Sequence, residues 1–399
     1  MSTAARAAMV RMNGSGEASW PAKIAGEALA AQERTWDALT KARGPLLRSR
    51  AKREVYAMVE AANRRWCLAK YPEGIPGLDT WRLETQEVPQ PGPRQILVKA
   101  KWLSVDPYMR GRMSPAQGYT KGAGIGEVMP GGGVGEVVAS NHPDWKPGDI
   151  ADSMAFGWQE YAVLTPDVAG TSGVNRADPA IAPIQSALSW LGMPGMTAYF
   201  GLLELGRPKP GDTVLVSAAS GAVGQLVGQI AKLCGARAVA VAGSDDKLAW
   251  CREIGFEETI NYKAVSDLTA AVKAACPDGV NVFFDNTGGP IQDAALKNLA
   301  IGARVIICGR IAQADRFGKP EIGERLLGSL IVSRASIHGL LVFDWWHRRD
   351  EAVKRLAAWG RAGKLRYAED VLDGIERMPE AFLRLLSGAN FGKQLVRLP

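Results

Sequence analysis

The chain has few of the residues that bind metals. Its 399 residues include three histidines, His142, His338 and His347, and five cysteines that are scattered singly without a Cys-x-x-Cys pair. Zinc needs Cys, His and carboxylate ligands that converge on one point, so we expect no metal site. An odd, dispersed set of cysteines is also a poor disulfide framework and indicates a reducing compartment, which we take to be the cytoplasm.

Long apolar runs are absent as well, and the positive charge of the chain is confined to one segment. No apolar run approaches the roughly 20 residues of a membrane-spanning helix, so we expect no membrane partner. The net charge is +7, but residues 1–65 hold 12 Lys and Arg against 6 Asp and Glu, whereas the rest of the chain holds 36 against 35. Because the body of the protein is close to neutral, a nucleic-acid partner is not supported.

The basic segment, residues 1–62, has a composition of its own, rich in Ala, Arg and Glu. Apolar residues at helical spacing over 23–43 favour a helix there. Two interpretations stay open. The segment is a real tail, disordered or partner-binding, or it is an artefact of start-site assignment and translation begins at Met58.

The rest of the chain changes its pattern twice. From residue 63 to about 185, short strand-like runs are separated by Gly and Pro. From Ser186, strands that are apolar throughout alternate with helices, which indicates a parallel sheet covered on both faces. The chain ends in two further helices and two strands. We therefore predict an α/β protein.

A glycine-containing turn, ASGAVG at 219–224, lies between the first of these apolar strands and a helix. Gly221 would let the backbone approach a pyrophosphate, and Gly224 would let the helix pack close to the strand. Ala222 and Val223 complete the turn. The first glycine of the fingerprint is replaced by alanine, but the strand–turn–helix context makes the pattern specific for a dinucleotide. The alternative is a tight turn that binds no ligand.

The end of the second strand distinguishes NAD from NADP. An NAD site usually has an acidic residue there to bind the ribose 2′-hydroxyl. This strand ends in Gly243 and Ser244, and Lys247 follows one turn later. Small residues and a lysine fit a 2′-phosphate, so we predict NADP(H) as the cofactor. The alternative is that Lys247 is a solvated lysine at the start of a helix.

Without ligands for a zinc ion, the sequence does not favour alcohol oxidation, in which zinc activates the hydroxyl. It favours hydride delivery to an acceptor that is already polarised, a C=C bond or a quinone.

Several stretches occur together in order: NRRWCLAKYPEG, WLSVDPYMRGRM, GMPGMTAYFGLLE, FDNTGG and GANFGKQLV. In this combination the chain, from about residue 63 to 399, resembles the zinc-independent medium-chain dehydrogenase/reductases. The most similar branch contains prostaglandin and leukotriene reductases, plant alkenal double-bond reductases and bacterial curcumin reductases.

The resemblance implies a catalytic domain with a GroES-like β-barrel, formed by residues 63–185 and 337–399. A Rossmann domain with a doubly wound parallel sheet, residues 186–336, is inserted between them, and the active site lies in the cleft. The resemblance also implies a homodimer that pairs through the edge strand of the Rossmann sheet at about 337–343, with a monomer as the alternative.

Residue by residue, the resemblance extends the cofactor site beyond the glycine turn and Lys247. The further positions are Tyr262 near the 2′-phosphate, Asn286 after the fourth strand, Cys308 and Gly309 near the nicotinamide, and Asn390, a cofactor contact from late in the chain. Two of these positions have a second interpretation. Asparagine is a common turn former, which is the alternative for Asn286, and it also occurs as a left-handed helix cap, which is the alternative for Asn390.

Tyr108, in VDPYMR, is the expected catalytic residue. Its phenol would donate to a substrate carbonyl and stabilise the enolate that forms as hydride reaches the β-carbon. The alternative is a packed tyrosine whose hydroxyl is satisfied by backbone. Ala314 stands where this branch typically has a tyrosine, which predicts a larger and less polar pocket there.

The resemblance thus predicts NADPH-dependent reduction of the C=C bond of α,β-unsaturated ketones or aldehydes, with a small enone or alkenal as substrate. The alternatives are an NADPH quinone oxidoreductase and a noncatalytic NADP-binding protein.

Overall fold

The computed structural model describes residues 62–399, apart from 116–118, 120, 317 and 321. The extension expected over residues 1–62 lies outside the described residues, except for Ala62, which begins the first strand. None of the helices in the described ranges is long and apolar enough to cross a membrane.

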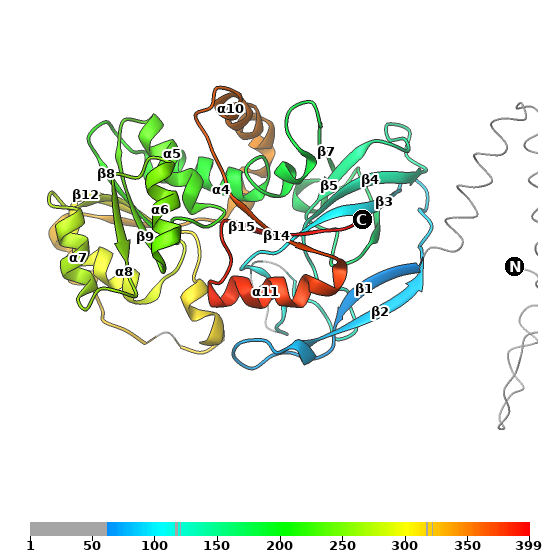
Figure 1. Ribbon diagram of the computed structural model, residues 1–399, viewed down its shortest axis with the longest axis horizontal. Coiled ribbons are helices and arrows are strands. Elements are labelled where there is room, and N and C mark those ends of the chain that lie inside the picture. Colours follow the sequence, from blue (N-terminus) through cyan, green and yellow to red (C-terminus); the bar gives the residue numbers. More distant parts are fainter. Residues whose placement is uncertain (1–61, 116–118, 120, 317, 321) are drawn as a thin grey trace, which may run out of the picture. The chain divides into compact units, whose positions relative to one another are not determined.

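One half of the described chain is built on a six-stranded parallel sheet with the order β10-β9-β8-β11-β12-β13 (Figure 1). The strand order reverses between β8 and β11, which is where doubly wound sheets bind ligands. The strands are β8 (Thr213–Ser217), β9 (Arg237–Ala242), β10 (Glu258–Asn261), β11 (Val280–Asp285), β12 (Leu299–Ile307) and β13 (Ser336–Gly339).

Helices cover both faces of this sheet because its strands are apolar on both sides. Along β9, Ala238 and Ala240 belong to one apolar cluster, whereas Val239 and Val241 belong to another. Successive strand residues point to opposite faces, so each face has its own core. The first core includes α4 (Met193–Phe200), α5 (Gly224–Leu233), α6 (Asp245–Glu253) and α10 (Arg349–Arg361), and the second includes α7 (Leu268–Ala275) and α8 (Gly289–Leu296).

The other half contains a seven-stranded mixed sheet with the order β14-β15-β3-β4-β5-β7, to which β6 adds by pairing with β3. The C-terminal strand β15 pairs antiparallel with β3, so strands from before and after the parallel-sheet half of the sequence lie side by side in one sheet (Figure 1). The strands are β3 (Ile96–Ser104), β4 (Gly133–Ser140), β5 (Ile150–Ser153), β6 (Tyr161–Leu164), β7 (Asn175–Arg176), β14 (Glu369–Asp373) and β15 (Lys393–Arg397).

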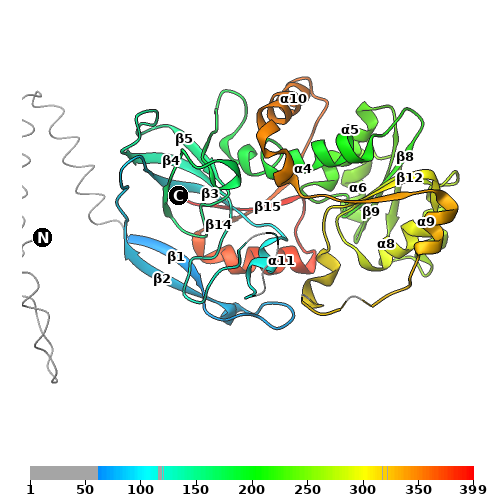
Figure 2. The same ribbon diagram turned by 180° about the vertical axis from the view of Figure 1, so that it is seen from behind.

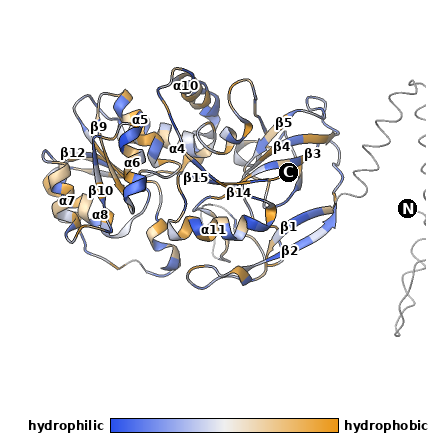
Figure 3. Ribbon diagram, viewed as in Figure 1, coloured by the Kyte–Doolittle hydropathy of each residue, from blue (hydrophilic) through white to orange (hydrophobic). Residues whose placement is uncertain are grey.

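Smaller elements complete this half. The strands β1 (Ala62–Leu68) and β2 (Trp81–Glu87) form a separate antiparallel pair that is largely hydrophilic in Figure 3. The helices α3 (Met109–Arg112) and α11 (Met378–Ser387) follow β3 and precede β15, respectively. The predicted α/β class, with a Rossmann sheet inserted into a β-rich half, is confirmed.

The structure differs from the boundary expected at residue 337. β13 pairs with β12 in the parallel sheet, and Ala352 and Leu356 of α10 are buried in the same core as α4 and α5. The apolar face of α10 therefore keeps this segment in the Rossmann half, and the chain returns to the mixed sheet at β14. The other domain boundaries stay predictions.

Candidate active site and cofactor site

The glycine turn lies between β8 and α5, at the point where the strand order reverses. A Cβ on Gly224 would lie 2.4 Å from the Ala218 carbonyl oxygen, so glycine is needed for this close approach of helix to strand. A Cβ on Gly221 would meet only that oxygen, at 3.1 Å, so its backbone is open to a ligand. With Ala222 and Val223 between them, this cradle fits a pyrophosphate at the start of a helix.

The end of β11 is tied to the end of β8 by a buried network. The Asp285 carboxylate accepts from the Ser217 hydroxyl at 2.9 Å and from the Thr287 backbone N–H at 2.9 Å. Asn286 donates its side-chain amide to the Ser217 carbonyl oxygen at 2.7 Å. Burial raises the pKa of Asp285, and the bonds it accepts oppose the rise. Asn286 thus bridges two strand ends, which goes beyond the role of a turn former.

The end of β12 joins the same network. The backbone N–H groups of Cys308 and Gly309 both donate to the Asp285 carbonyl oxygen, at 2.8 and 3.0 Å. A Cβ on Gly309 would lie 2.9 Å from the Asn286 carbonyl oxygen. Burial raises the pKa of the Cys308 thiol to about 12, so this thiol is neutral at physiological pH. Hydrogen bonds therefore connect the carboxyl ends of β8, β11 and β12 at one edge of the parallel sheet.

Two lysines and a tyrosine gather at the end of β9. A Cβ on Gly243 would lie 3.1 Å from the Tyr262 hydroxyl oxygen and 3.1 Å from Cε of Lys263. The pKa of Lys247 is lowered, first by burial and then by the positive charge of Lys263. The ammonium groups of two lysines and the phenol of a tyrosine beside a residue without a side chain can bind a phosphate group, such as the 2′-phosphate of NADP. The sequence pattern did not single out Lys263, although it stands next to Tyr262 in INYK.

Asn390 follows the end of α11. Lys247 donates to the Gly388 carbonyl oxygen at 2.6 Å, which joins this segment to α6. Gly388, with φ +69°, is the left-handed cap of α11, so the alternative that Asn390 is that cap is wrong. Asn390 is buried instead, and its amide donates to the Gly392 carbonyl oxygen at 2.8 Å.

Tyr108 lines a cavity of about 280 Å³ whose walls come mainly from the mixed-sheet half. The aromatic rings of Phe156 and Phe343 line it as well. No hydrogen bond to the Tyr108 hydroxyl is found among the described residues, which does not support the alternative of a hydroxyl satisfied by backbone. Burial, followed by the nearby Asp106 carboxylate, raises the pKa of Tyr108 far above its usual value, so the phenol stays protonated.

A buried ion pair holds the turn that carries Tyr108. Lys393 of β15 is 2% exposed, and its ammonium group donates to the Ser104 hydroxyl at 2.7 Å, the Val105 carbonyl oxygen at 2.8 Å and Asp106 at 2.6 Å. Because Asp106 also accepts from the Met109 N–H through its carbonyl oxygen, Lys393 fixes the path of the backbone from β3 into α3.

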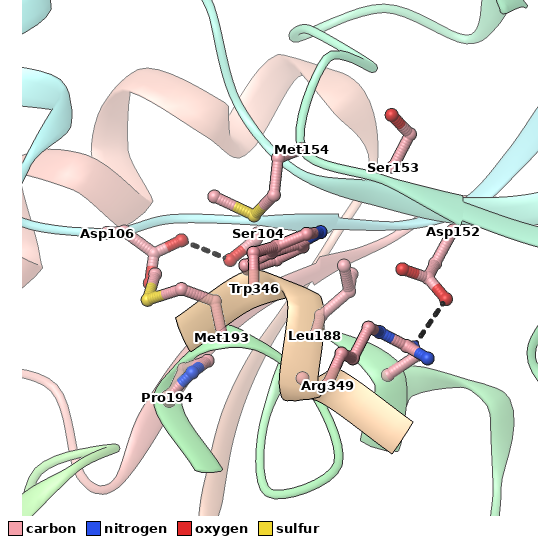
Figure 4. Close-up of a pocket in the computed structure, with 12 residues that line it drawn as sticks. Ser104, Asp106, Asp152, Ser153, Met154, Leu188, Met193, Pro194, Trp346 and Arg349 are labelled. Atoms are coloured by element: carbon pink, nitrogen blue, oxygen red, sulfur yellow. Dashed lines mark hydrogen bonds and ion pairs between the residues drawn. The ribbon is translucent and has the colours of Figure 1, made fainter. Parts of the chain in front are cut away.

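A second, smaller cavity lies behind this turn. Figure 4 shows Asp106 bonded to Ser104 on one side and Asp152 paired with Arg349 on the other. The Arg349–Asp152 pair, at 3.3 Å, joins α10 to β5 and so links the two halves. Burial raises the pKa of Asp152 to about 6, against the opposing effect of Arg349.

Comparison with known proteins identifies the family. A model described as the N-terminal domain of oxidoreductase matches residues 64–171, and one described as zinc-binding dehydrogenase matches 222–358. A putative NADP-dependent oxidoreductase of Bacillus subtilis, YfmJ, is 44% identical over 85% of this chain and 98% of its own length. The chain belongs to the medium-chain dehydrogenase/reductase family.

Two further relatives place it in the zinc-independent enone-reductase branch. The NADPH-dependent curcumin reductase of Escherichia coli is 39% identical over 84% of this chain and 97% of its own. The crystal structure of CurA from Vibrio vulnificus in complex with NADPH superposes with a TM-score of 0.78 at 38% identity, over 84% of this chain and 99% of that one. The chain is therefore an oxidoreductase.

The name of the second family model refers to zinc. Across the described ranges no group of three or more His, Cys, Asp and Glu residues is placed to hold a metal ion. The His142 side chain is buried, and its Nε2 lies 3.0 Å from a carboxylate oxygen of Asp167.

Ala314, which stands where this branch of the medium-chain dehydrogenase/reductases typically has a tyrosine, lies at a contact between the two halves. This residue is buried, and its carbonyl oxygen accepts from Nε of Arg110 at 3.2 Å, while the Arg110 guanidinium also donates to the Gly74 carbonyl oxygen at 2.8 Å. Ala314 is not among the residues that line the cavity beside Tyr108. It forms a contact between the halves, and the larger, less polar pocket expected at this position stays a prediction.

Proposed function

We propose that the chain is an NADPH-dependent reductase of the C=C bond of α,β-unsaturated ketones and aldehydes. The observation that carries this proposal is the place of Tyr108 at the wall of a cavity lined by aromatic rings, in a chain related to curcumin reductase. Burial raises the pKa of this phenol, which favours its protonated form. A steady-state assay with NADPH and benzylideneacetone tests the proposal. We expect the saturated ketone as product, and absence of turnover across several enones would contradict the proposal.

Tyr108, Phe156 and Phe343 have separate roles in this reduction. NADPH, when bound, supplies a hydride to the β-carbon of the substrate. Tyr108 donates a hydrogen bond to the carbonyl oxygen, where negative charge develops, and the α-carbon then takes up a proton. Phe156 and Phe343 line the cavity with apolar surface, which limits competing water and strengthens that hydrogen bond.

We further propose that the strand ends hold NADP(H). In this arrangement the turn from Gly221 to Gly224 approaches the pyrophosphate, and Asn286, Cys308 and Gly309 form the edge nearest the nicotinamide. Lys247, Tyr262 and Lys263 bind the 2′-phosphate. Asn390, which stands near the C-terminal end of the chain, also contacts the cofactor.

Lys247→Ala should lower the preference for NADPH. Loss of one charge-assisted bond to the 2′-phosphate costs about 1.5–3 kcal/mol, so we expect KM for NADPH to rise by roughly 10- to 100-fold with little change for NADH. The measurement is KM for both cofactors, with Lys273→Ala on α7 as the control. Equal effects on the two cofactors would rule out the 2′-phosphate role.

We also propose a homodimer that pairs through the free edge of the parallel sheet. β13 is the edge strand, and α9 (Leu327–Ser333) lies beside the same edge (Figure 2). Ile331 is 79% exposed and Ile337 is 44% exposed. An unpaired strand beside exposed apolar side chains favours pairing with a second copy.

Ile331→Glu should weaken that dimer, because it would bury a carboxylate in an apolar contact. Light scattering at micromolar concentration is expected to give the mass of a dimer for the wild type and of a monomer for the variant. Ile75→Glu, in the loop between β1 and β2, is the control and should stay dimeric. A monomeric wild type would overturn the proposed dimer.

We propose a cytoplasmic location, since none of the five cysteines is paired.

A further inference from the structure

The chain crosses from the parallel-sheet half to the mixed sheet between α10 and β14, and two glutamines of α5 hold this crossing. The Gln225 side-chain oxygen accepts from the Ala368 N–H at 2.8 Å, and its amide group donates to the Ala368 carbonyl oxygen at 3.2 Å. Gln229, one turn later, binds the Arg366 backbone in the same way, with both distances 2.7 Å. Each glutamine thus makes two hydrogen bonds to the backbone of one residue, as a neighbouring antiparallel strand would.

Ala368 is bound by the start of β15 as well. Its carbonyl oxygen also accepts from the Lys393 N–H at 3.0 Å, and a Cβ on Gly392 would lie 2.2 Å from the same oxygen, so the two segments touch where a glycine leaves room. Lys393 is the first residue of β15, and its ammonium group holds the turn that carries Tyr108. Hydrogen bonds therefore lead from Gln225 through Ala368 and Lys393 to that turn.

Gln225 is also joined to the glycine turn, which it directly follows in the chain. Its backbone N–H donates to the Gly221 carbonyl oxygen at 3.1 Å, and the residue is 1% exposed. The side-chain oxygen accepts a second hydrogen bond from Nε1 of Trp250 at 3.3 Å. Turning the amide over would place its N–H groups against two other donors, so these partners fix the orientation of the side chain.

We propose that Gln225 is a positioning residue that aligns the cofactor turn with Tyr108. Its bonds to Ala368 keep the glycine turn in register with the strand that begins at Lys393, and hence with the turn of Tyr108. A displacement of about 1 Å between reacting groups can slow a reaction by roughly 100-fold, so this register bears directly on hydride transfer. The inference rests on the proposed function and deepens it, because it names the side chain that holds the two parts of the site together.

A merely structural role for Gln225 makes a different prediction, and Gln229 is the matched control that separates the two. Gln229 is buried on the same helix and binds the same crossing, and its amide also donates to the Gln225 carbonyl oxygen at 2.7 Å. Loss of either amide therefore removes a comparable set of bonds. If both serve only to stabilise the fold, the two losses should act alike, whereas a positioning role requires that the loss of Gln225 alone is felt at the turn of Tyr108.

Hydrogen exchange of the full chain without cofactor tests this path with no turnover. The backbone N–H groups of residues 109–111 bond back within the turn that carries Tyr108. In Gln225→Met these groups should exchange roughly 10-fold faster, the factor for loss of about one net hydrogen bond, and in Gln229→Met they should exchange as in the wild type. Gln225→Asn, which keeps an amide on a stem one methylene shorter, should give a smaller rise and replaces the methionine variant if that one does not fold.

Single-turnover kinetics with saturating NADPH and benzylideneacetone supply the second readout. Hydride transfer should be roughly 10- to 100-fold slower in Gln225→Met than in Gln229→Met or the wild type, with an unchanged Kd for NADPH because the glycine turn itself is intact. Wild-type exchange at residues 109–111 in Gln225→Met, an equal change in both variants, or an unchanged rate of hydride transfer would overturn the inference. If no enone is turned over by the wild type, the proposed function fails, and the exchange measurement still decides whether Gln225 holds the turn of Tyr108.

Discussion

Lys393→Met is expected to destabilise the protein by about 3–5 kcal/mol, because it leaves the Asp106 carboxylate buried without its cation. Asp106 is 4% exposed, Lys393 is 2% exposed, and their charged atoms lie 2.6 Å apart. Methionine keeps much of the volume of the lysine stem, so the effect reports the charge rather than a cavity. Urea unfolding of the full chain measures the change in the free energy of unfolding.

The matched control is the double variant Lys393→Met with Asp106→Asn. Removing the carboxylate charge should restore a large part of the loss, because no buried ion then lacks a partner, and the coupling of the two residues follows from the double-mutant cycle. A loss below about 1 kcal/mol in the single variant would mean that the pair does not hold the turn as described.

Tyr108→Phe is expected to lower kcat/KM for enones by roughly 100- to 1000-fold, the range for loss of one donor to a developing oxyanion. Phenylalanine fills the same space, so KM for NADPH should stay the same. Because burial raises the pKa of Tyr108 above its usual value, ionisation of this phenol should not lower the wild-type rate between about pH 6 and 9.

Tyr161→Phe serves as the control for this variant. Tyr161 lies on β6 of the same sheet and does not line the cavity, so its loss should leave kcat/KM close to that of the wild type. A Tyr108→Phe variant as active as this control would remove Tyr108 from the mechanism.

The local features of the site were predictable from the sequence because their signals are short. The strand, the glycine turn and the helix from β8 to α5 follow one another directly, and Lys247 stands one turn after the end of β9. The apolar character of strands such as β9 indicated a sheet buried on both faces, which the two separate cores confirm.

The rest depends on pairs of residues that are far apart in the chain. Ser217 bonds Asp285 across 68 positions, and Lys393 bonds Asp106 across 287. A buried lysine in a terminal strand looks the same in sequence as an exposed one. The edge strand expected at about 337–343 is β13, which pairs with β12 at one edge of the parallel sheet. The point at which the chain leaves this half depends on the packing of α10, and no local pattern shows it.

The most direct test of the central claim is the fate of the hydride. Wild-type protein is given NADPH deuterated at C4 of the nicotinamide, on either face, together with an enone, and in parallel a quinone, with NADH as the cofactor control. The account predicts a saturated ketone that carries deuterium at the β-carbon for one of the two labelled faces, with NADPH strongly preferred over NADH. Turnover of the quinone alone, an allylic alcohol as product, or NADPH binding without any turnover would contradict it.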